Sequence, residues 1–526
     1  MTEIDVLIAG GGPVGLMLAC ELQRRGVSYR IVTQLMAIDP HSRAIGMQPR
    51  TLEILAPLGV TDRLAAAGNW VDGITVSSEG RERADIDLQG LAGETPYPRI
   101  LIVPEAETEA ALEAALVRLG GRVERGRALT GFDHAADGVT ATVNGDSGEE
   151  TIRARWLVGC DGAHSVVRHT LGLGFEGAQF PERFWLADVQ MNWSRTLDRA
   201  HAFFHPDGIA VAFPFGNDRW RVMMDVPDQR DAADPTLERL RAAFSERAGQ
   251  AVAMADPRWI GAFAVHHRMV ETFRRGRVFL AGDAAHIHSP VGGQGMNTGI
   301  QDAHNLAWKL AIVIHGRATE ALLDTYDAER RPVARRLLRD VGRATHVVTG
   351  LHPALRLFRD QVLLRLVQLG PIRALISQRV AEFDVSYEES LLSSGRGHPA
   401  PGRRAPFVFL TRPDGRSATI FDVFDTVGFT ALVFAGLSAG DAATAAATVA
   451  RGALGDLGSV VVVAPSVSAD WDGPLLLDRS GAAHQRYGAS NGALVLVRPD
   501  GYLGFRGRLD DGPSLMRYLQ RAHVAA

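Results

Sequence analysis

The first 35 residues carry the hydrophobic pattern of a β-α-β unit. The apolar run Ile4–Ala9 predicts a buried strand, and apolar residues at helical spacing predict a helix from Val14 to about Arg25. Gly26 stands where a helix commonly ends, and Ser28–Val32 predicts a second strand. Two strands joined by a helix favour a parallel sheet at the start of the chain.

Further along, the pattern predicts helices that alternate with strand-rich stretches. From about 180 to 270, alternating and aromatic residues such as Trp220–Val226 predict an antiparallel sheet that forms one wall of a ligand site. The Ser/Gly/Pro-rich stretch 393–402 predicts a linker, and Asp500-Gly501 predicts a hairpin turn. The other predicted helices are Thr51–Leu58, Thr108–Leu119 and Gln301–His315 with a helical continuation to about Ala381, and the other predicted strands are Val139–Val143, Thr151–Val158, Arg277–Ala281, Ala431–Phe434, Ser459–Val463 and Ala493–Val497.

Composition narrows the classes of function. The chain has 526 residues, of which 46% are hydrophobic and 22% charged, and its net charge is −4. These values are ordinary for a globular protein and argue against a basic nucleic-acid platform. No apolar run reaches the length of a bilayer span, and a strand pattern at Ile4 leaves no room for a signal peptide, so we expect a cytoplasmic protein. Cys20 and Cys160 are the only cysteines, too few for a disulfide framework.

The turn between the first strand and the first helix carries candidate chemistry. Gly10, Gly12, Pro13 and Gly15 stand there in G-x-G-x-x-G spacing, which between a strand and a helix is the fingerprint of dinucleotide binding. Gly10 would allow the tight turn, Gly12 the approach of a pyrophosphate to backbone amides, and Gly15 close packing of helix on strand. The pyrophosphate would then lie at the helix N-terminus. The alternative is an incidental glycine-rich turn.

Two further motifs follow predicted strands: Asp161-Gly162 after Cys160, and Gly282-Asp283, which runs on to Asn297 through Gly292-Gly293-Gln294-Gly295. Together the three motifs resemble the GxGxxG, DG and GD motifs of the class A flavoprotein aromatic hydroxylases, which are single-component FAD monooxygenases. The C-terminal sequences 401–406 and 496–502 resemble the thioredoxin-like tail of the aromatic polyketide hydroxylase and rifampicin monooxygenase branch.

The resemblance implies an α/β protein with a Rossmann-like FAD-binding domain, an inserted antiparallel-sheet substrate domain and a C-terminal thioredoxin-like domain. The FAD-binding domain would comprise residues 1–72, 98–180 and 270–395, the substrate domain 73–97 and 181–269, and the tail domain 400–526. The tail contains no cysteine, so it cannot perform thiol–disulfide exchange and would serve packing or dimerisation. Either a monomer or a homodimer agrees with this arrangement.

The resemblance also implies a role for each motif residue. Asp283 would accept a hydrogen bond from the ribityl chain, small residues up to Asn297 would lie beside the flavin ring, and a helix starting near Asn297 would direct its positive end at the flavin. Asp161 and Arg43 would lie on the pyrophosphate side. The alternatives are that Asp161 is a turn residue, that Arg43 is a surface charge and that Asp283 is a helix cap. The implied cofactor-binding residues are Gly10, Gly12, Pro13, Gly15, Thr33, Gln34, Arg43, Glu105, Asp161, Gly282, Asp283, Pro290, Gly293, Gly295, Met296 and Asn297.

Two positions depart from the family pattern. Thr33-Gln34 stands where a glutamate usually accepts from the adenosine ribose, and a hydroxyl there would weaken the contact by roughly 1–2 kcal/mol. Glu105 replaces a glutamine that commonly touches the cofactor. The absence of this glutamate can also indicate that NADP is the bound dinucleotide. The GD motif, however, fits a ribityl chain, which NADP lacks.

In this family NADPH or NADH reduces FAD, O2 forms a C4a-hydroperoxide, and one oxygen atom is transferred to an electron-rich ring. Ile45 stands where phenol hydroxylases of the family carry an aspartate, which favours larger polycyclic substrates whose phenols are already acidic. No catalytic side chain is assigned, because the flavin supplies the chemistry. The expected substrate wall comprises Ile45, Phe203, Phe213, Pro214, Phe215, Arg219, Trp220, Arg221 and Pro290, several of which could equally be sheet core.

Alternatives remain at this stage. The same scaffold could perform Baeyer–Villiger oxidation, epoxidation or antibiotic inactivation, and a flavin- or ligand-binding protein without catalysis is the alternative from another class. His286 and His288 suggest a metal site, but no third ligand stands at suitable spacing, so we expect none. His266-His267 is expected at a strand end, and Cys20 in the core of the first helix.

Overall fold

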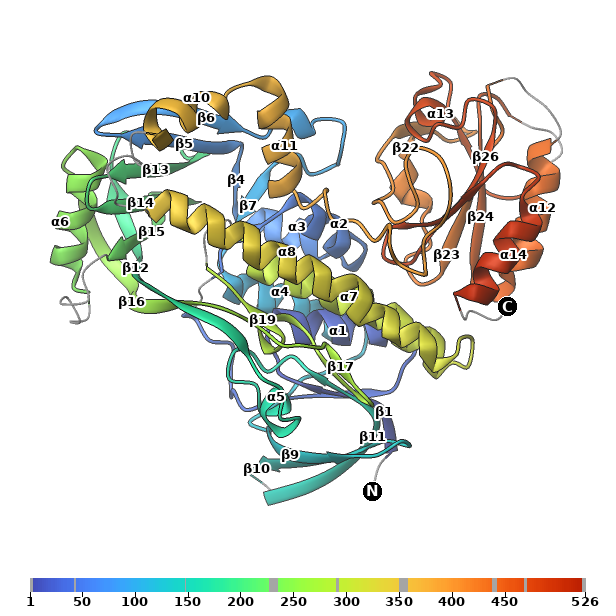
Figure 1. The fold of residues 1–526 in the computed structure, drawn as a ribbon, viewed down its shortest axis with the longest axis horizontal. Coiled ribbons are helices and arrows are strands. Elements are labelled where there is room, and N and C mark those ends of the chain that lie inside the picture. Colours follow the sequence, from blue (N-terminus) through green and yellow to red (C-terminus); the bar gives the residue numbers. More distant parts are fainter. Residues whose placement is uncertain are drawn as a thin grey trace.

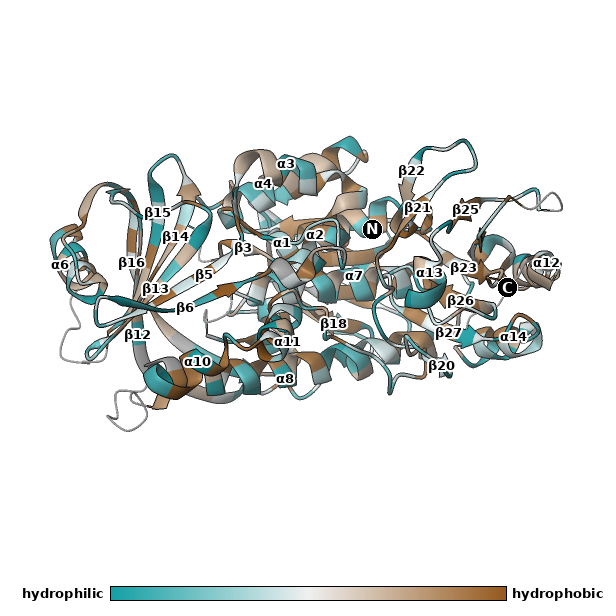
Figure 2. Cartoon of the chain, turned by 90° about the horizontal axis from the view of Figure 1, so that it is seen from above, coloured by the Kyte–Doolittle hydropathy of each residue, from teal (hydrophilic) through white to brown (hydrophobic). Residues whose placement is uncertain are grey.

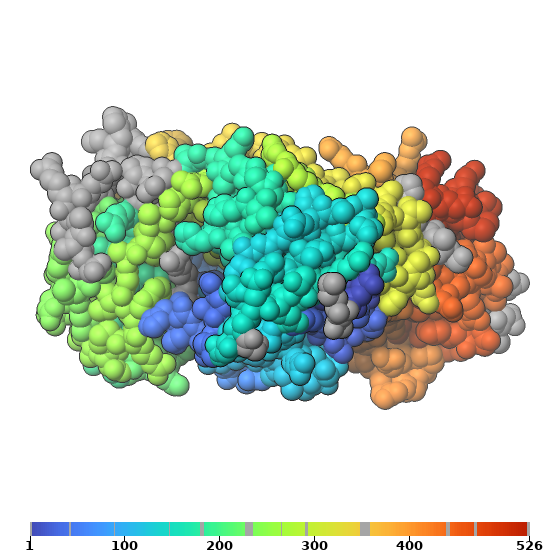
Figure 3. All heavy atoms as spheres, turned by 90° about the horizontal axis from the view of Figure 1, so that it is seen from below, coloured from blue at the N-terminus to red at the C-terminus, as the bar shows by residue number. Residues whose placement is uncertain are grey.

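The computed structural model describes residues 3–41, 44–146, 148–226, 235–289, 293–349, 358–437, 442–467 and 471–522. These residues form three eight-stranded sheets and a small three-stranded one. The C-terminal sheet lies at one end of an elongated molecule and the sheet built around β12 at the other (Figures 1 and 3). None of the described helices combines the length and apolar character that crossing a bilayer requires.

The central sheet confirms the predicted β-α-β unit. Its strand order is β17-β18-β11-β1-β2-β8, with β10 and β9 extending from β11, and β1 pairs in parallel with both β2 and β11. The strands are β1 (Glu3–Ala9), β2 (Tyr29–Thr33), β8 (Glu124–Arg125), β9 (Ala128–His134), β10 (Val139–Gly145), β11 (Gly148–Gly159), β17 (Arg274–Arg275) and β18 (Val278–Leu280). Fully buried aliphatic residues of β1, α1 (Pro13–Gln23) and α7 (Gly295–Ile314) share one core, because each of these elements is buried nearly all round.

The second sheet has the order β19-β16-β12-β15-β14-β13-β5-β6 and is antiparallel except between β13 and β5. This confirms the antiparallel stretch predicted after residue 180. α6 (Leu237–Ala248) covers one face of it. The strands are β5 (Gly73–Ser78), β6 (Arg81–Asp87), β12 (Glu176–Asn192), β13 (Arg199–His205), β14 (Gly208–Gly216), β15 (Arg219–Val226), β16 (Ala253–Met269) and β19 (His286–Ile287).

The C-terminal sheet has the order β20-β27-β26-β23-β24-β25-β21-β22. β23 is parallel to β24 and antiparallel to β26, an arrangement compatible with the thioredoxin-like tail implied above. β20 lies within the predicted linker, so part of that stretch is paired with β27 instead of being a free connection. The elements are β20 (Ser394–Gly395), β21 (Phe409–Thr411), β22 (Ser417–Thr419), β23 (Phe429–Phe434), α12 (Ala442–Leu454), β24 (Gly458–Ala464), β25 (Leu475–Leu477), α13 (Ala482–Arg486), β26 (Ala493–Val497), β27 (Leu503–Gly507) and α14 (Gly512–Arg521).

Helices connect these sheets. The long α8 crosses the middle of the molecule in front of α7 (Figure 1). The predicted helix 301–315 begins six residues earlier, at Gly295, and the predicted helix 51–58 is α2 followed by a 3-10 turn. The remaining main elements are β3 (Gly46–Met47), α2 (Pro49–Leu55), α3 (Val60–Ala67), β4 (Asn69–Val71), β7 (Ile100–Ile102), α4 (Glu105–Arg118), α5 (Val166–Thr170), α8 (Asp324–Thr349), α10 (Leu364–Leu366) and α11 (Gly370–Val380).

Candidate functional site

The turn into α1 is built so that only glycine fits at two positions. Gly10 has φ +111°, and a Cβ there would lie 2.2 Å from the Cys160 carbonyl oxygen. A Cβ at Gly15 would lie 2.0 Å from the Gly10 carbonyl oxygen, so this glycine permits the close packing of helix and strand. At Gly12 the nearest atom to a Cβ is Glu109 Oε1, at 3.8 Å. This turn therefore leaves one side open beside Gly12.

The N-terminus of α1 is suited to an anion. Gly12 provides no side-chain cap, Pro13 follows it, and the first turn contains no acidic residue. The first backbone amides of such a helix lack intrahelical partners and carry the positive end of the helix dipole. A pyrophosphate can therefore bind there.

Thr33 and Glu105, the two departures from the family pattern, are placed by different strands, since Thr33 ends β2 and Glu105 comes after β7. Thr33 ends β2, is buried, and its hydroxyl accepts a hydrogen bond from the Leu35 amide at 3.3 Å, while Gln34 is exposed. Glu105 begins α4 and exchanges hydrogen bonds with the backbone of Ala44, both at 3.2 Å. Both side chains that depart from the family pattern thus also hold local backbone.

The GD turn packs directly on α1 and α7. Gly282 has φ +60°, and Cβ atoms at Gly282 and Gly299 would lie 2.8 and 2.7 Å from Val14 Cγ2. Asp283, next to Gly282, is exposed. The first and third motifs therefore meet in one place, with the Asp283 side chain at its surface.

Asn297 ties the N-terminus of α7 to β3. Its side-chain oxygen accepts from the Gln48 amide at 3.0 Å, and its nitrogen donates to the carbonyl oxygens of Gly46 at 2.8 Å and Gly293 at 3.0 Å. Gly293 has φ +62°, and the first turn of α7 has neither a side-chain cap nor an acidic residue. Small residues and a positive helix end thus lie beside β3.

An aromatic face of the second sheet adjoins this region through β3 and β7. Gly46 pairs with Ile102, and Ile102 belongs to a small hydrophobic cluster, with Val71 and Ala200, against which Phe213 and Phe215 pack. Ile45, just before Gly46, is half-buried, and its carbonyl oxygen accepts from the Val103 amide.

A buried ion pair organises the aromatic face. Arg221 forms a two-pronged pair with Asp188 at 2.6 Å, and its guanidinium lies 5.4 and 5.6 Å from the ring centres of Phe215 and Trp259. Trp259 in turn lies 6.1 Å, edge to face, from the ring of His41 in the loop that precedes Ile45. The arrangement offers flat rings held by a fixed charge pair, which suits a planar ligand.

Comparison with known proteins identifies the family of the chain. Residues 3–341 match the family described as "FAD binding domain", and residues 398–524 match "Aromatic-ring hydroxylase, C-terminal". The chain belongs to the FAD-dependent aromatic-ring hydroxylases. It is 37% identical to the 6-methylpretetramide 4-monooxygenase of Streptomyces rimosus over 99% of this chain and 94% of that protein, and 36% identical to the rifampicin monooxygenase of Streptomyces venezuelae over 76% and 82%.

Solved structures agree. The anhydrotetracycline hydroxylase OxyS from Streptomyces rimosus has a TM-score of 0.78, 32% identity and 99% coverage of both chains. The ternary complex of aklavinone-11 hydroxylase with FAD and aklavinone has a TM-score of 0.78, 26% identity and 99% coverage of both chains.

The structure corrects two residues assigned to the substrate wall of this hydroxylase. Phe203 and Trp220 are fully buried between the second sheet and α6, where they pack with Trp193 and Phe244. Side chains alternate between the faces of a strand, so these two lie opposite Phe213 and Arg221. Arg219 is the first residue of β15 and pairs with Asp256 at that end of the strand. Arg43 and Pro290 lie outside the described residues.

Asp161 caps a helix. Its carboxylate accepts from the Ser165 hydroxyl at 2.5 Å and the Val167 amide at 3.1 Å at the start of α5, and burial raises its pKa despite these bonds. The turn-residue alternative thus describes its observed contacts, and its role toward a cofactor stays a prediction.

His267, His286 and Cys20 are buried, whereas His266 and His288 are half-buried. His288 Nδ1 lies 2.7 Å from the Ser289 carbonyl oxygen, and burial lowers its pKa to about 4. His266 and His267 lie near the end of β16, and Cys20 is buried in α1, as predicted.

Sequence analysis missed Asp302, which is completely buried on α7. Its carboxylate accepts from the Gly282 amide at 3.1 Å and from Arg330 Nε at 2.6 Å, and lies 2.8 Å from His286 Nε2. Burial opposes ionisation of Asp302, but Arg330 and His286 outweigh it and hold the pKa below its usual range. A carboxylate among the apolar residues of a helix was the available signal, because buried acids are rarely unpaired.

Proposed function

We propose that this hydroxylase binds FAD across the three motifs and uses NADPH or NADH and O2 to hydroxylate a polycyclic aromatic natural product. The observation that carries the proposal is the link from the N-terminus of α7, through Asn297, Gly46 and Ile102, to the rings of Phe213 and Phe215. It brings a planar-ligand face beside the region that the family uses for the flavin.

The residues present fit FAD. The uncapped N-terminus of α1 would hold the pyrophosphate, with Gly12 leaving the approach open. Asp283, exposed on the turn after β18, would accept from ribityl hydroxyls, and the positive end of α7 would stabilise negative charge on the reduced ring. When bound, FAD would take up a hydride from the nicotinamide and activate O2.

The protein's part is positioning and the exclusion of water. Phe213 and Phe215 would stack on the substrate, while the Arg221–Asp188 pair fixes the neighbouring rings. Ile45 provides no carboxylate, so an acidic phenol of the substrate itself would supply the electron-rich ring. The polycyclic substrate class follows the names of the relatives, which are monooxygenases of 6-methylpretetramide and of rifampicin.

The test is oxidation of NADPH and NADH by the purified holoenzyme with a panel of polycyclic phenols, followed by mass spectrometry and NMR of the product. We expect one substrate to stimulate oxidation, and the product to gain one oxygen as an aromatic hydroxyl. A ring-expanded lactone as product would show Baeyer–Villiger oxidation in place of hydroxylation, and an epoxide would show epoxidation. Nicotinamide oxidation that no aromatic compound stimulates would favour the binding protein.

A variant tests the aromatic face. Phe215→Ala removes a ring that lies under Arg221, so we expect KM for the aromatic substrate to rise about 10-fold or more, the effect of losing roughly 1.4 kcal/mol of binding. Phe409→Ala, an exposed ring of the C-terminal sheet, is the matched control and should leave KM unchanged. Equal KM values for both variants would remove this face from the substrate site.

A further inference from the structure

A cleft in the C-terminal part of the chain has the properties of an anion site. It has a volume of about 550 Å³ and lies along the β20–β27 edge and α14, far along the chain from the three flavin motifs. Five arginines and a single aspartate line it: Arg396, Arg506, Arg508, Arg517, Arg521 and Asp511. The ribbon of α14, coloured partly as hydrophilic, lies beside β20 and β27 (Figure 2). The cleft therefore carries a concentrated positive charge on a protein whose net charge is negative.

Arg506 is the unusual member of this set. It is 94% buried and donates from Nη2 to the Gly488 carbonyl oxygen at 2.8 Å, while its Nη1 has no hydrogen-bond partner among the described residues. Burial lowers the pKa of Arg506, and no carboxylate among the described residues compensates its charge. Buried arginines normally have a paired anion, because an uncompensated charge is costly.

The backbone around Arg506 makes room for the guanidinium. A Cβ at Gly397 would lie 2.3 Å from Arg506 Nε. Gly488 has φ +53°, and a Cβ there would lie 3.4 Å from Arg506 Nη2. The rim arginines remain available: among the described residues Arg517 bonds only the Ser514 hydroxyl, and Arg508 pairs loosely with Asp510 at 3.3 Å on the surface. The Asp511 carboxylate accepts from the Arg508 amide, so it is partly occupied.

We propose that this cleft binds a small molecule bearing a phosphoryl or pyrophosphoryl group. Guanidinium groups match the geometry and charge of phosphate oxygens, and several of them around one cleft favour a polyanion over a single carboxylate. The volume lies in the range of small-molecule pockets and is too small for a folded partner. The bound anion would compensate Arg506, with Arg396, Arg517 and Arg521 at the rim.

The experiment is calorimetric titration of the full-length holoenzyme, separated from excess flavin, with pyrophosphate and, separately, with ADP. Binding of either supports the site, and binding of ADP alone assigns it to a nucleotide. We expect Arg517→Glu with Arg521→Glu to weaken binding at least 10-fold, and raised salt to weaken it further. Arg479→Glu, an exposed arginine outside the cleft, is the control and should have no effect.

Arg506→Met distinguishes the cleft from the flavin site. We expect it to weaken pyrophosphate binding at least 10-fold while the flavin absorbance per chain stays unchanged. The proposal would be overturned if neither anion bound at millimolar concentration, if citrate bound more tightly than pyrophosphate, or if the rim double variant bound as tightly as the Arg479→Glu control. The rim variant is exposed, so its result stands even where Arg506→Met lowers stability.

Discussion

At the scale of single residues, the carboxylate of Asp302 organises the turn that carries Asp283. One buried group binds the Gly282 amide, His286 and Arg330 together, and Arg330 extends the contact to the Tyr387 hydroxyl at 2.9 Å. Gly282 and His286 belong to the turn and Arg330 belongs to α8, so one ionised side chain of α7 ties the turn to both helices.

We predict that Asp302→Asn lowers the free energy of unfolding by about 3–5 kcal/mol, because it leaves Arg330 buried without its counter-ion. In the native protein the contribution of Asp302 is complete above about pH 4 and is lost as pH falls through the lower pKa of the folded state. Urea unfolding as a function of pH measures both effects. The control is Asp324→Asn, because the Asp324 carboxylate that pairs with Arg274 is exposed; it should lower the free energy of unfolding by less than about 1 kcal/mol. An equal loss in both variants would contradict a structural role of the Asp302 carboxylate.

Glu109 should titrate near neutrality. Burial and then the neighbouring Glu105 raise its pKa to about 8. A carboxyl whose folded pKa is raised contributes stability that is complete below its unfolded pKa and is lost as pH rises through the folded value. We predict that the native protein loses stability between about pH 5 and 8, and that Glu109→Gln reduces this loss.

The measurement for Glu109 is the midpoint of urea unfolding from pH 5 to 9. The control is Glu107→Gln, which changes an exposed glutamate two residues away in the same helix. A Glu109→Gln variant whose midpoint follows the native pH dependence would show that another group is responsible.

At the scale of elements, the contact of α1, the GD turn and α7 depends on small residues. A Cβ at Gly299 would lie 2.7 Å from Val14 Cγ2 and 3.1 Å from Gly282 Cα. We predict that Gly299→Ala costs about 1–3 kcal/mol through overpacking and that adding Val14→Ala recovers part of the loss. Unfolding of the single and double variants forms the measurement.

Gly452→Ala supplies the comparison for that prediction. Gly452 lies in α12 with no atom within 4 Å of a built Cβ, so the change should be neutral or slightly stabilising. If Val14→Ala and Gly299→Ala add independently, the two elements are not in the close contact described.

The sequence predicted those features that local sterics determine. The glycine spacing required a strand, a turn and a helix, and the structure confirms all three. Alternation predicted a sheet after residue 180, but it could not tell which face would meet α6, so Phe203 and Trp220 were assigned to the substrate wall together with Phe213. Asp302 was missed because its partners come from segments 16 to 28 residues away.

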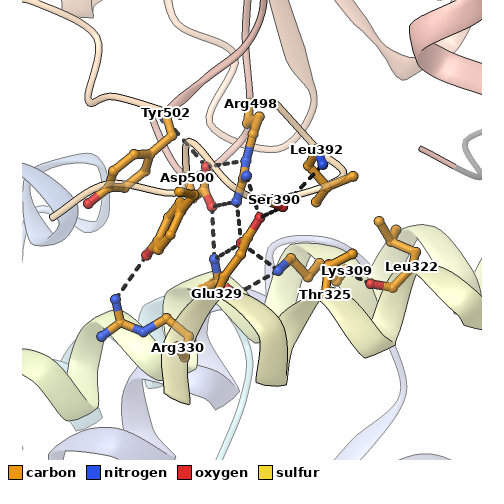
Figure 4. Close-up of polar contacts among 12 residues, drawn as sticks. Lys309, Leu322, Thr325, Glu329, Arg330, Ser390, Leu392, Arg498, Asp500 and Tyr502 are labelled. Atoms are coloured by element: carbon orange, nitrogen blue, oxygen red, sulfur yellow. Dashed lines mark hydrogen bonds and ion pairs between the residues drawn. The ribbon is translucent and has the colours of Figure 1, made fainter. Parts of the chain in front are cut away.

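At the scale of the whole molecule, a buried ionic network joins the C-terminal sheet to helices α7 and α8 (Figure 4). Arg498, at the end of β26, donates to Glu329 of α8 at 2.7 Å and to Asp500 at 2.6 Å, and Lys309 of α7 donates to Glu329 at 2.8 Å. Asp500 also accepts from Trp308. Residues of the predicted hairpin turn thus form the interface, as well as closing the hairpin.

We predict that Arg498→Met lowers the free energy of unfolding by about 3–5 kcal/mol, since it leaves Glu329 and Asp500 buried with fewer counter-charges. Lys309 is the only lysine of the chain and is fully buried. Its acetylation by an amine-reactive acetylating reagent, measured by peptide mass spectrometry, therefore reports opening of the interface. We expect faster acetylation in Arg498→Met. Arg416→Met, at an exposed pair, should not change the rate; equal rates in both variants would contradict a role of the network in holding the two parts together.

The most direct test of the central claim, that the three motifs form an FAD site of a monooxygenase, is the absorbance spectrum of the purified chain before and after FAD is added and unbound flavin is removed, followed by addition of NADPH without oxygen and then of air. The account predicts a yellow protein with one FAD per chain, bleached by NADPH and restored by O2, despite Thr33 and Glu105. A colourless protein that retains no added FAD and leaves NADPH unchanged would contradict it, and the binding-protein alternative would replace it.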